Sequence, residues 1–232
     1  MNYELTKAFL FDMDGVLYDS MPNHATSWVA AVQKYGLSMT REEVYMNEGR
    51  TGAGTIHALT QRTWGRDATE EEIANIYQTK SDVFNTCPTA LPMPGADSVL
   101  HNVHARGWLP LIVTGSGQKS LLDRLNQAYP GIFKRELMVT AFDVTQGKPF
   151  PEPYLKGLEK AGIALNKDGS PLRPEEAVVV ENAPLGIRAA KAAGIYCIAV
   201  NTGPLPDQVL IDAGADIVFP NMQALSDHIK QA

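Results

Sequence analysis

The sequence predicts an α/β fold in which a doubly wound parallel sheet carries a small helical bundle inserted after its first strand. Short apolar runs recur between helical stretches, and one long segment near the N-terminus lacks such runs. The runs are continuously apolar rather than alternating, so we expect helices to cover both faces of the sheet. A chain of 232 residues, 44% hydrophobic and 20% charged, is long enough and apolar enough to bury a large core.

Six apolar runs are the expected buried strands. No repeat with a period of roughly 20 to 50 residues and no low-complexity tract interrupts their order, which argues against solenoids and propellers. The runs are Lys7 to Phe11, Leu109 to Val113, Leu137 to Thr140, Ala177 to Val180, Tyr196 to Val200 and Ile217 to Phe219.

Residues 21–88 are the expected helical insertion, because their apolar side chains fall at helical spacing. Thr40 and Thr69 each stand three residues before a glutamate, a pattern in which hydroxyl and carboxylate satisfy free amides at a helix start. Two further helices are expected, over 21–35 before Gly36 and over 55–64 before Gly65.

Prolines mark the return from the insertion to the sheet. Pro88, Pro92 and Pro94, followed by Gly95, form a connection that is not helical and is partly stiff. Such a connection suits a hinge. We therefore expect a helical cap of residues 20–88 on a core made of residues 1–19 and 89–232.

Composition and charge exclude several classes of protein. A net charge of −6 gives little electrostatic support for binding nucleic acid or an anionic membrane, so any phosphate must be bound locally. Cys87 and Cys197 stand far apart, which argues against a disulfide framework or a thiolate zinc site. The apolar run before Asp12 is too short for a signal peptide or membrane span, so we expect a cytoplasmic location. We also expect a monomer.

Two aspartates, in the string DMDGV, directly follow the first expected strand. Open α/β sheets hold their ligands at this carboxyl end. A carboxylate that is ionised at neutral pH attacks phosphorus without a general base, so Asp12 is the candidate nucleophile. Asp14 is the candidate acid and base, provided that its neighbours raise its pKa. The alternative is a solvated acid in an ordinary Asp-Gly turn.

The string VTGSG follows the second long strand and precedes a helix expected from Lys119. Thr114 and Ser116 offer hydroxyl donors, and a helix N-terminus offers free amides for a phosphate. Gly115 and Gly117 let the backbone approach closely. The alternative is an ordinary capped turn.

Lys148 stands in the string GKPFPEPY, where alternate prolines stiffen an extended segment. Its charge would offset that of the nucleophile and a phosphate, unless it is an ordinary surface lysine. Glu181 and Asn182 end a further strand and offer the oxygen ligands that Mg²⁺ prefers. Their alternative role is to cap the helix that Pro184 begins.

The strings DMDGV, VTGSG, GKPFPEPY and VVVENAPLGI together resemble the haloacid dehalogenase superfamily of phosphatases and phosphomutases, in order and spacing over nearly the whole chain. The resemblance implies a Rossmann-like core, an inserted helical cap, and Mg²⁺-dependent transfer through an aspartyl phosphate. It implies the following roles: Asp12 as nucleophile and metal ligand, Asp14 as acid and base with its carbonyl on the metal, Thr114 and Lys148 as phosphate binders, and Glu181 and Asn182 as metal ligands. The family usually has aspartate at position 182, so we expect weaker magnesium binding here.

Within the superfamily the chain is similar to the β-phosphoglucomutase branch, through the string DGVLYDS and His24 on the first cap helix. That resemblance makes His24 a helper that contacts Asp14 when the cap is closed. The alternative is a partly exposed helix histidine.

The cap loop bears on the substrate. Sugar phosphomutases of this branch carry a lysine and a later arginine there to bind a distal phosphate. In this chain Glu48 stands near the lysine's place, and no second arginine follows Arg50 in the loop. The strings EGRTGA, ELMVTAFDV and VENAPLG look like the Bacteroides-type inorganic pyrophosphatases of the superfamily. Arg50 and Lys80 are the remaining cations for a second phosphate, unless they are solvated surface residues.

We therefore expect a Mg²⁺-dependent phosphohydrolase that acts through an aspartyl phosphate on inorganic pyrophosphate or a small phosphate ester. Two alternatives remain open, a β-phosphoglucomutase and a general sugar or glycolate phosphatase. A non-enzymatic phosphate-binding protein is disfavoured because neither Asp12 nor Lys148 is missing.

Overall fold

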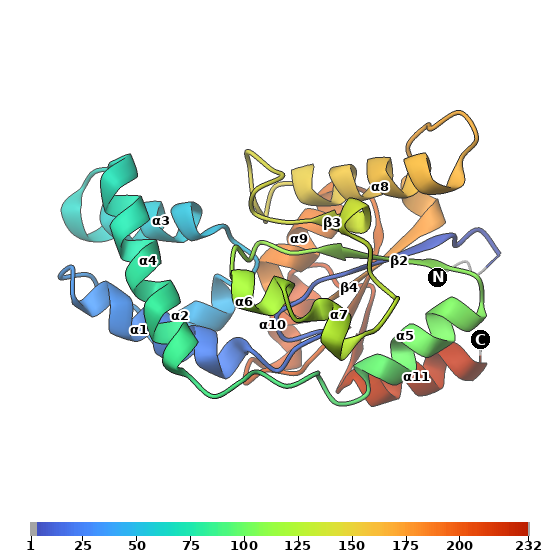
Figure 1. Cartoon of the computed structure of the whole chain (residues 1–232), viewed down its shortest axis with the longest axis horizontal. Helices are drawn as coiled ribbons and strands as arrows, with labels where there is room; N and C mark the ends of the chain where they lie inside the picture. Colours follow the sequence, from blue (N-terminus) through green and yellow to red (C-terminus); the bar gives the residue numbers. More distant parts are fainter. Residues whose placement is uncertain (1–3, 232) are drawn as a thin grey trace.

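The computed structural model describes residues 4–231, and within them it contains one six-stranded sheet (Figure 1). Its strands lie in the order β3-β2-β1-β4-β5-β6, and neighbouring strands are parallel. The chain order of the strands reverses beside β1, which is where open α/β sheets hold ligands. The strands are β1 (Ala8–Phe11), β2 (Leu109–Val113), β3 (Met138–Val139), β4 (Ala177–Glu181), β5 (Tyr196–Val200) and β6 (Ile217–Phe219).

All six predicted strands are present, and the third differs most from its predicted bounds. The run at 137–140 yields a strand of only two residues, because the 3₁₀ helix η1 (Arg135–Leu137) precedes it and a turn follows. In that turn Asp143 Oδ2 accepts hydrogen bonds from the amide and the hydroxyl of Thr140, at 2.8 and 2.7 Å. The ends of the predicted core span, residues 1–3 and 232, lie outside the described residues.

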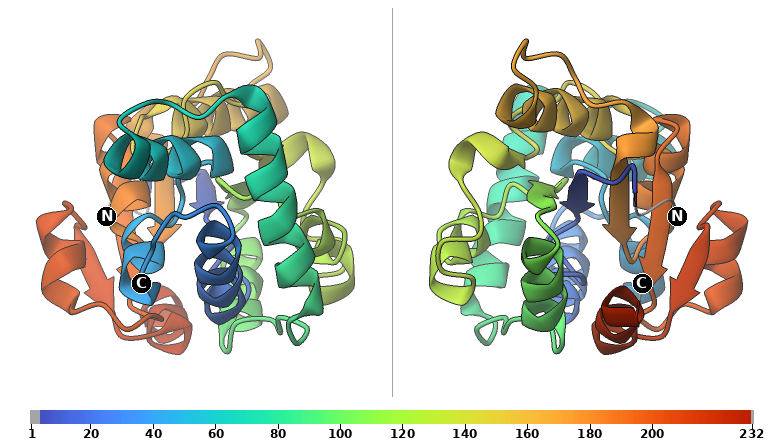
Figure 2. Two further views of the ribbon diagram at one scale, coloured as in Figure 1. Left: turned by 90° about the vertical axis from the view of Figure 1, so that its left-hand side faces the viewer. Right: turned by 90° about the vertical axis from the view of Figure 1, so that its right-hand side faces the viewer.

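The sheet separates two apolar cores, and β1 contributes to both. Phe9 and Phe11 pack on one face with α5 and α11, whereas Ala8 and Leu10 pack on the other with α8 and α9. Helices on both faces, visible in Figure 2, confirm the predicted doubly wound α/β architecture. The helices around the sheet are α5 (Ala96–Ala105), α6 (Lys119–Leu122), α7 (Leu125–Ala128), α8 (Glu152–Leu165), η2 (Pro174–Glu176), α9 (Pro184–Ala192), α10 (Asp207–Asp212) and α11 (Met222–Gln231).

Four helices lie beyond the carboxyl ends of the strands and share an apolar core of their own (Figure 1). We call residues 20–88, which contain these helices and the loops between them, the four-helix segment, and the rest of the chain the sheet region. Both predicted capping boxes are present, at Thr40 and Thr69. The third helix begins earlier than predicted because the side chain of Thr51 caps it. The four helices are α1 (Met21–Gln33), α2 (Arg41–Met46), α3 (Gly52–Trp64) and α4 (Glu70–Thr86).

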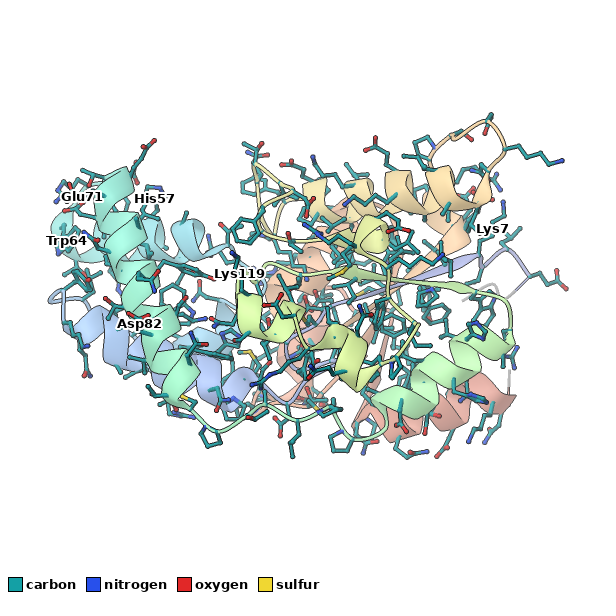
Figure 3. All side chains as sticks on the ribbon, in the orientation of Figure 1. Lys7, His57, Trp64, Glu71, Asp82 and Lys119 are labelled. Carbon is teal, nitrogen blue, oxygen red and sulfur yellow. The ribbon has the colours of Figure 1, made fainter. Side chains whose placement is uncertain are left out.

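The two connections between the four-helix segment and the sheet region run side by side. The amide of Asp19 donates to the carbonyl of Leu91 at 2.9 Å, and the amide of Met93 donates to the carbonyl of Leu17 at 2.8 Å. The labelled His57, Trp64 and Glu71 mark the far end of the segment (Figure 3). Across residues 4–231, no helix combines the length and apolarity needed to cross a bilayer.

Candidate active site

The predicted site residues meet at the carboxyl edge of the sheet. Asp12, Thr114 and Glu181 follow or end the adjacent strands β1, β2 and β4, which pair in parallel register. Between this edge and the four-helix segment lies a cavity of about 50 Å³. Residues that line it include Asp12, Asp14, His24, Glu48, Arg50, Lys80, Thr114, Gly115 and Ser116.

Lys148 links two carboxylates across this edge. Its ammonium donates to Asp12 Oδ1 and to Glu181 Oε1, each at 2.6 Å, and to the carbonyl of Val113 at 3.0 Å. The side chain is 1% exposed. Burial opposes the charge, but Asp12 and Glu181 outweigh it and raise the pKa of Lys148 above its usual value. Lys148 is therefore a buried, fully paired cation and not the surface lysine of the alternative interpretation.

Glu181 is also saturated with donors. Besides Lys148, the hydroxyl of Tyr154 donates to Oε1 at 2.7 Å, and the amides of Asn182 and Ala183 donate to Oε2 at 3.1 and 3.3 Å. A Cβ atom on Gly186 would lie 1.8 Å from Glu181 Oε1, so this position of the Glu181 carboxylate requires glycine at 186. Glu181 thus helps to begin α9 and holds Lys148, which leaves Asn182 as the better placed oxygen for a metal.

Asp14 is held by two residues of the segment's first turn. Oδ1 accepts a hydrogen bond from Ser20 Oγ at 2.5 Å and contacts His24 Nε2 at 2.9 Å. Burial works to raise the pKa of Asp14, but His24, Ser20 and Lys80 outweigh it and lower the value to about 2. The expectation of a raised pKa is not met in this structure, and Asp14 is ionised at neutral pH.

His24 is buried, which contradicts the interpretation of a partly exposed helix histidine. Its ring also packs on Phe84, with 4.6 Å between centroids. Burial lowers the pKa of His24, as does the charge of Lys80, and the neighbouring carboxylate of Asp14 opposes both. The predicted contact between His24 and Asp14 is present in this structure.

Asp12 has the opposite electrostatic surroundings to Asp14. Burial raises the pKa of Asp12 to about 8, Glu181 and Asp14 add to the rise, and Lys148 opposes it. The ionised state of Asp12 therefore depends on the cations beside it, and Lys148 is the one in direct contact. An additional positive charge beside Asp12 would favour the carboxylate.

Asn182 supplies an observation that bears directly on such a cation. Its Nδ2 donates to both oxygens of Glu48 at 3.0 Å, whereas its Oδ1 is buried with no hydrogen-bond partner. Burial and the neighbouring charge of Asp12 raise the pKa of Glu48 well above its usual value. Residues 4–231 hold no cluster of three His, Cys, Asp or Glu side chains with metal-binding geometry. The donor set that fits Mg²⁺ is mixed: the Asp12 carboxylate, the Asp14 carbonyl and the orphaned Asn182 amide oxygen.

The loop between α2 and α3 lies directly on the sheet region. A Cβ atom on Gly115 would lie 2.1 Å from the carbonyl oxygen of Gly49, and one on Gly49 would lie 2.7 Å from the side chain of Lys148. A Cβ atom on Gly147 would meet Thr51 at 2.6 Å. These glycines allow the close approach that brings Glu48 over Asn182.

The hydroxyls of the VTGSG string shape its backbone. The amide of Ser116 donates to Thr114 Oγ1 at 3.0 Å, and the amide of Gln118 donates to Ser116 Oγ at 3.2 Å. The structure brings Thr114, Gly115 and Ser116 to the cavity wall, so each is placed where a bound phosphate would contact it.

The four-helix segment contributes two cations. Lys80 is 1% exposed, and its ammonium lies 4.9 Å from the ring centroid of Phe84 and 3.3 Å from Gln118 Oε1. Burial lowers the pKa of Lys80 to about 8. Arg50 Nε is buried without a hydrogen-bond partner. Lys80 is therefore not the solvated surface residue of the alternative interpretation, and Arg50 is only partly exposed.

Three site residues were not among the predicted ones: Ser20, Gln118 and Tyr154. Each stands in or beside a string that the sequence analysis used, namely DGVLYDS, VTGSG and GKPFPEPY. Their partners are Asp14, Lys80 and Glu181. Only proximity to those strings could have indicated them, because residue type alone does not separate them from ordinary polar residues.

Comparisons with known proteins identify the family of this chain. A family model of haloacid dehalogenase-like hydrolases matches residues 6–194. Hexitol phosphatase A of Escherichia coli is 32% identical over 196 residues, which cover 84% of this chain and 83% of that protein. The phosphorylated carbohydrates phosphatase of Thermotoga maritima is 29% identical over 210 residues, which cover 90% of this chain and 92% of that protein.

Solved structures extend the likeness over almost the whole chain. A candidate β-phosphoglucomutase from Bacteroides vulgatus is 55% identical, with a TM-score of 0.90 over 97% of this chain and 88% of that one. A hydrolase from Pseudomonas syringae is 23% identical, with a TM-score of 0.84 over 97% of this chain and 99% of that one, which is a likeness of fold.

Proposed function

The chain belongs to the haloacid dehalogenase-like hydrolases, in their β-phosphoglucomutase-like branch, and from that membership we propose that it is a Mg²⁺-dependent inorganic pyrophosphatase. Membership by itself makes it an enzyme of the phosphatase and phosphomutase type. The choice of pyrophosphate, or of a comparably small phosphate ester, rests on the site.

The observation that carries the proposal is the size and charge of the cavity. The cavity is small, about 50 Å³, so with the four-helix segment in this position it favours a compact substrate over a hexose phosphate. Lys80 and the unpartnered Arg50 Nε bring positive charge to the cavity that Asp12 also lines. Such a site suits a compact substrate with a second phosphate.

The first chemical step uses Asp12. Lys148 holds its Oδ1, so Oδ2 attacks the nearer phosphorus in line with the bridging oxygen of pyrophosphate. The bond from Oδ2 to phosphorus forms as the bond from phosphorus to the bridging oxygen breaks, and the leaving phosphate keeps the electron pair. Lys148 offsets charge at the reacting centre.

The second step uses Asp14. Its carboxylate, aligned by His24 and Ser20, takes a proton from a water that attacks the aspartyl phosphate, which releases phosphate and restores Asp12. A phosphate leaves far more readily than a sugar alkoxide and needs less protonation. An ionised Asp14 is compatible with such a leaving group.

Mg²⁺ would be held by the Asp12 carboxylate, the Asp14 carbonyl and Asn182 Oδ1, and it would supply positive charge against the phosphate oxygens. We propose further that residues 20–88 form a cap that opens to admit substrate and closes to exclude bulk water, hinged at the paired connections beside Asp19 and Met93. A cytoplasmic, monomeric protein with no nucleic-acid or membrane partner stays a prediction of the sequence.

A phosphate-release screen tests the proposal, comparing pyrophosphate with hexose and pentose phosphates, with and without Mg²⁺. We expect pyrophosphate to have the highest kcat/KM and turnover to disappear with chelator. Equal rates across many monoesters would overturn it.

Sugar-phosphate chemistry is the second candidate, since the relatives are named as hexitol and carbohydrate phosphatases. The structural relative named as a candidate β-phosphoglucomutase favours isomerisation within that class. A mutase forms glucose 6-phosphate from the β-1-phosphate without releasing phosphate, so a coupled assay separates it from both hydrolases. Glu48 in place of the expected lysine opposes it.

A further inference from the structure

Lys80 and Gln118 form a buried contact between the four-helix segment and the sheet region. Lys80 lies on α4, Gln118 lies in the loop before α6, and the two side chains are 1% and 3% exposed. The ammonium donates to Gln118 Oε1 at 3.3 Å. None of the ion pairs among residues 4–231 includes Lys80.

Two further hydrogen bonds fix the orientation of the Gln118 amide. Its Nε2 donates to Asn85 Oδ1 at 3.1 Å and to Ser120 Oγ at 3.2 Å. With the nitrogen committed to those acceptors, the oxygen must face Lys80. An ammonium has donors only, so this is the one orientation that stabilises it.

Aromatic rings flank the ammonium, and the charge of Asp14 acts on it from beyond ion-pair distance. Its nitrogen lies 5.8 Å from the ring centroid of Trp28 and 5.6 Å from that of Tyr77, with Phe84 on a third side. Rings and a neutral amide hold a cation in place but leave its charge available to an anion. Lys80 lines the same cavity as Asp12 and Thr114.

Gln118 is also joined to the loop that faces the nucleophile. The backbone amide of Gln118 donates a hydrogen bond to Ser116 Oγ, and the backbone amide of Ser116 donates one to Thr114 Oγ1. Gln118, which accepts the hydrogen bond from Lys80, is therefore linked through Ser116 to Thr114 at the cavity. The contact with Lys80 exists only when the segment lies against the sheet region, as in this structure.

We propose that Gln118 is a positioning residue that aims the Lys80 ammonium at the phosphate that is not transferred. This inference rests on the proposed function and deepens it. It assigns selectivity for a second phosphate to Gln118 in the sheet region, which acts through Lys80 in the four-helix segment. A glutamate at position 118 would hold Lys80 equally near but cancel its charge.

Calorimetric titration of the full chain in Mg²⁺ tests the proposal with two probes, imidodiphosphate, which carries two phosphates and resists hydrolysis, and inorganic phosphate. In Gln118→Met, similar in volume, we expect the ratio of imidodiphosphate to phosphate affinity to fall about tenfold. We expect at least as large a fall in Gln118→Glu. Gln78→Ala, on an exposed glutamine of α4 that bonds Asp82, is the matched control and should keep the wild-type ratio.

The coupling to Lys80 gives a second readout that a merely structural role would not produce. In a Lys80→Met background, Gln118→Met should change the ratio little, because the cation it positions is gone. The inference would be overturned if Gln118→Met lowered the affinity ratio as much in the Lys80→Met background as in the wild-type chain. It would also be overturned if Gln118→Met weakened both probes equally, or if the wild-type chain did not prefer imidodiphosphate. Failure of the proposed function is read separately, from pyrophosphate turnover of the wild-type chain against hexose phosphates.

Discussion

The sheet region and the four-helix segment each bury one lysine at the candidate active site, and the two lysines are held in opposite ways. Lys148 donates to three acceptors, two of them carboxylates. Lys80 has one neutral acceptor and three aromatic neighbours. The sheet region therefore pairs its charge in advance, whereas the four-helix segment leaves its charge to be met by an anion.

This difference separates two tasks within one site. A paired lysine holds the nucleophile and its neighbour in place whatever the substrate is, because its partners belong to the protein. An unpaired buried lysine gains its full partner only when an anion binds, so it contributes to selectivity. The most informative substitutions are those that break one task and leave the other.

The largest expected effect is on the chemical step in the sheet region. Asp12→Asn should lower kcat by about four orders of magnitude or more, since an amide does not form the aspartyl phosphate. Phosphate release measures the loss, and circular dichroism confirms the fold. Asp168→Asn, in an exposed loop, is the control and should behave as wild type. A rate near wild type in Asp12→Asn would remove Asp12 from the mechanism.

The second prediction compares the two lysines by stability. Lys148→Met leaves Asp12 and Glu181 buried without their cation and should lower the free energy of unfolding by about 3–5 kcal/mol. Lys80→Met removes a buried charge that has no ion-pair partner and should raise the free energy of unfolding. Urea denaturation at neutral pH without Mg²⁺ measures both. Equal destabilisation by the two substitutions would contradict the comparison.

The third prediction concerns pH. The pKa of Lys80 is lowered to about 8 by burial, so its ammonium loses the proton as pH rises through that value. We expect kcat/KM for pyrophosphate, at saturating Mg²⁺, to decline above about pH 8. Lys80→Met should lower the neutral-pH value about tenfold or more and abolish the alkaline decline. A decline that persists in Lys80→Met would assign it to another group.

The smallest expected effect is confined to the four-helix segment. Thr69→Ala removes the side-chain acceptor for the amide of Glu72 at the start of α4 and should lower the free energy of unfolding by about 1 kcal/mol. Hydrogen exchange should accelerate in the first turn of α4. Thr86→Ala, at the other end of the same helix, serves as the reference for a threonine that caps no amide. Faster exchange spread evenly over the sheet would contradict an effect confined to the four-helix segment.

Much of the site followed from local sequence because parallel strands end at one edge. Asp12, Thr114 and Glu181 each stand at a strand's carboxyl end, so their meeting required only the strands and their order. Lys148 and Asn182 followed from the same strings. The capping boxes at Thr40 and Thr69 were equally local, since each needs only four consecutive residues.

The charge states were not accessible in that way. Asp12 and Asp14 are two residues apart in the same string, yet burial raises the pKa of one and partners lower that of the other. The difference arises from Glu181 on one side and His24 with Ser20 on the other. A pKa depends on burial and on every nearby charge, and neither is encoded by the residues next in sequence.

By itself the sequence determined the layered α/β fold, the position of the helical insertion, and which strand ends carry the polar groups, because periodicity and strand-end chemistry are local properties. The tertiary structure alone decided that Glu48 lies on Asn182, that Glu181 is saturated, and that Lys80 is held by Gln118. Those contacts join residues far apart in the chain across two packed surfaces, and only the packing of one surface on the other selects them.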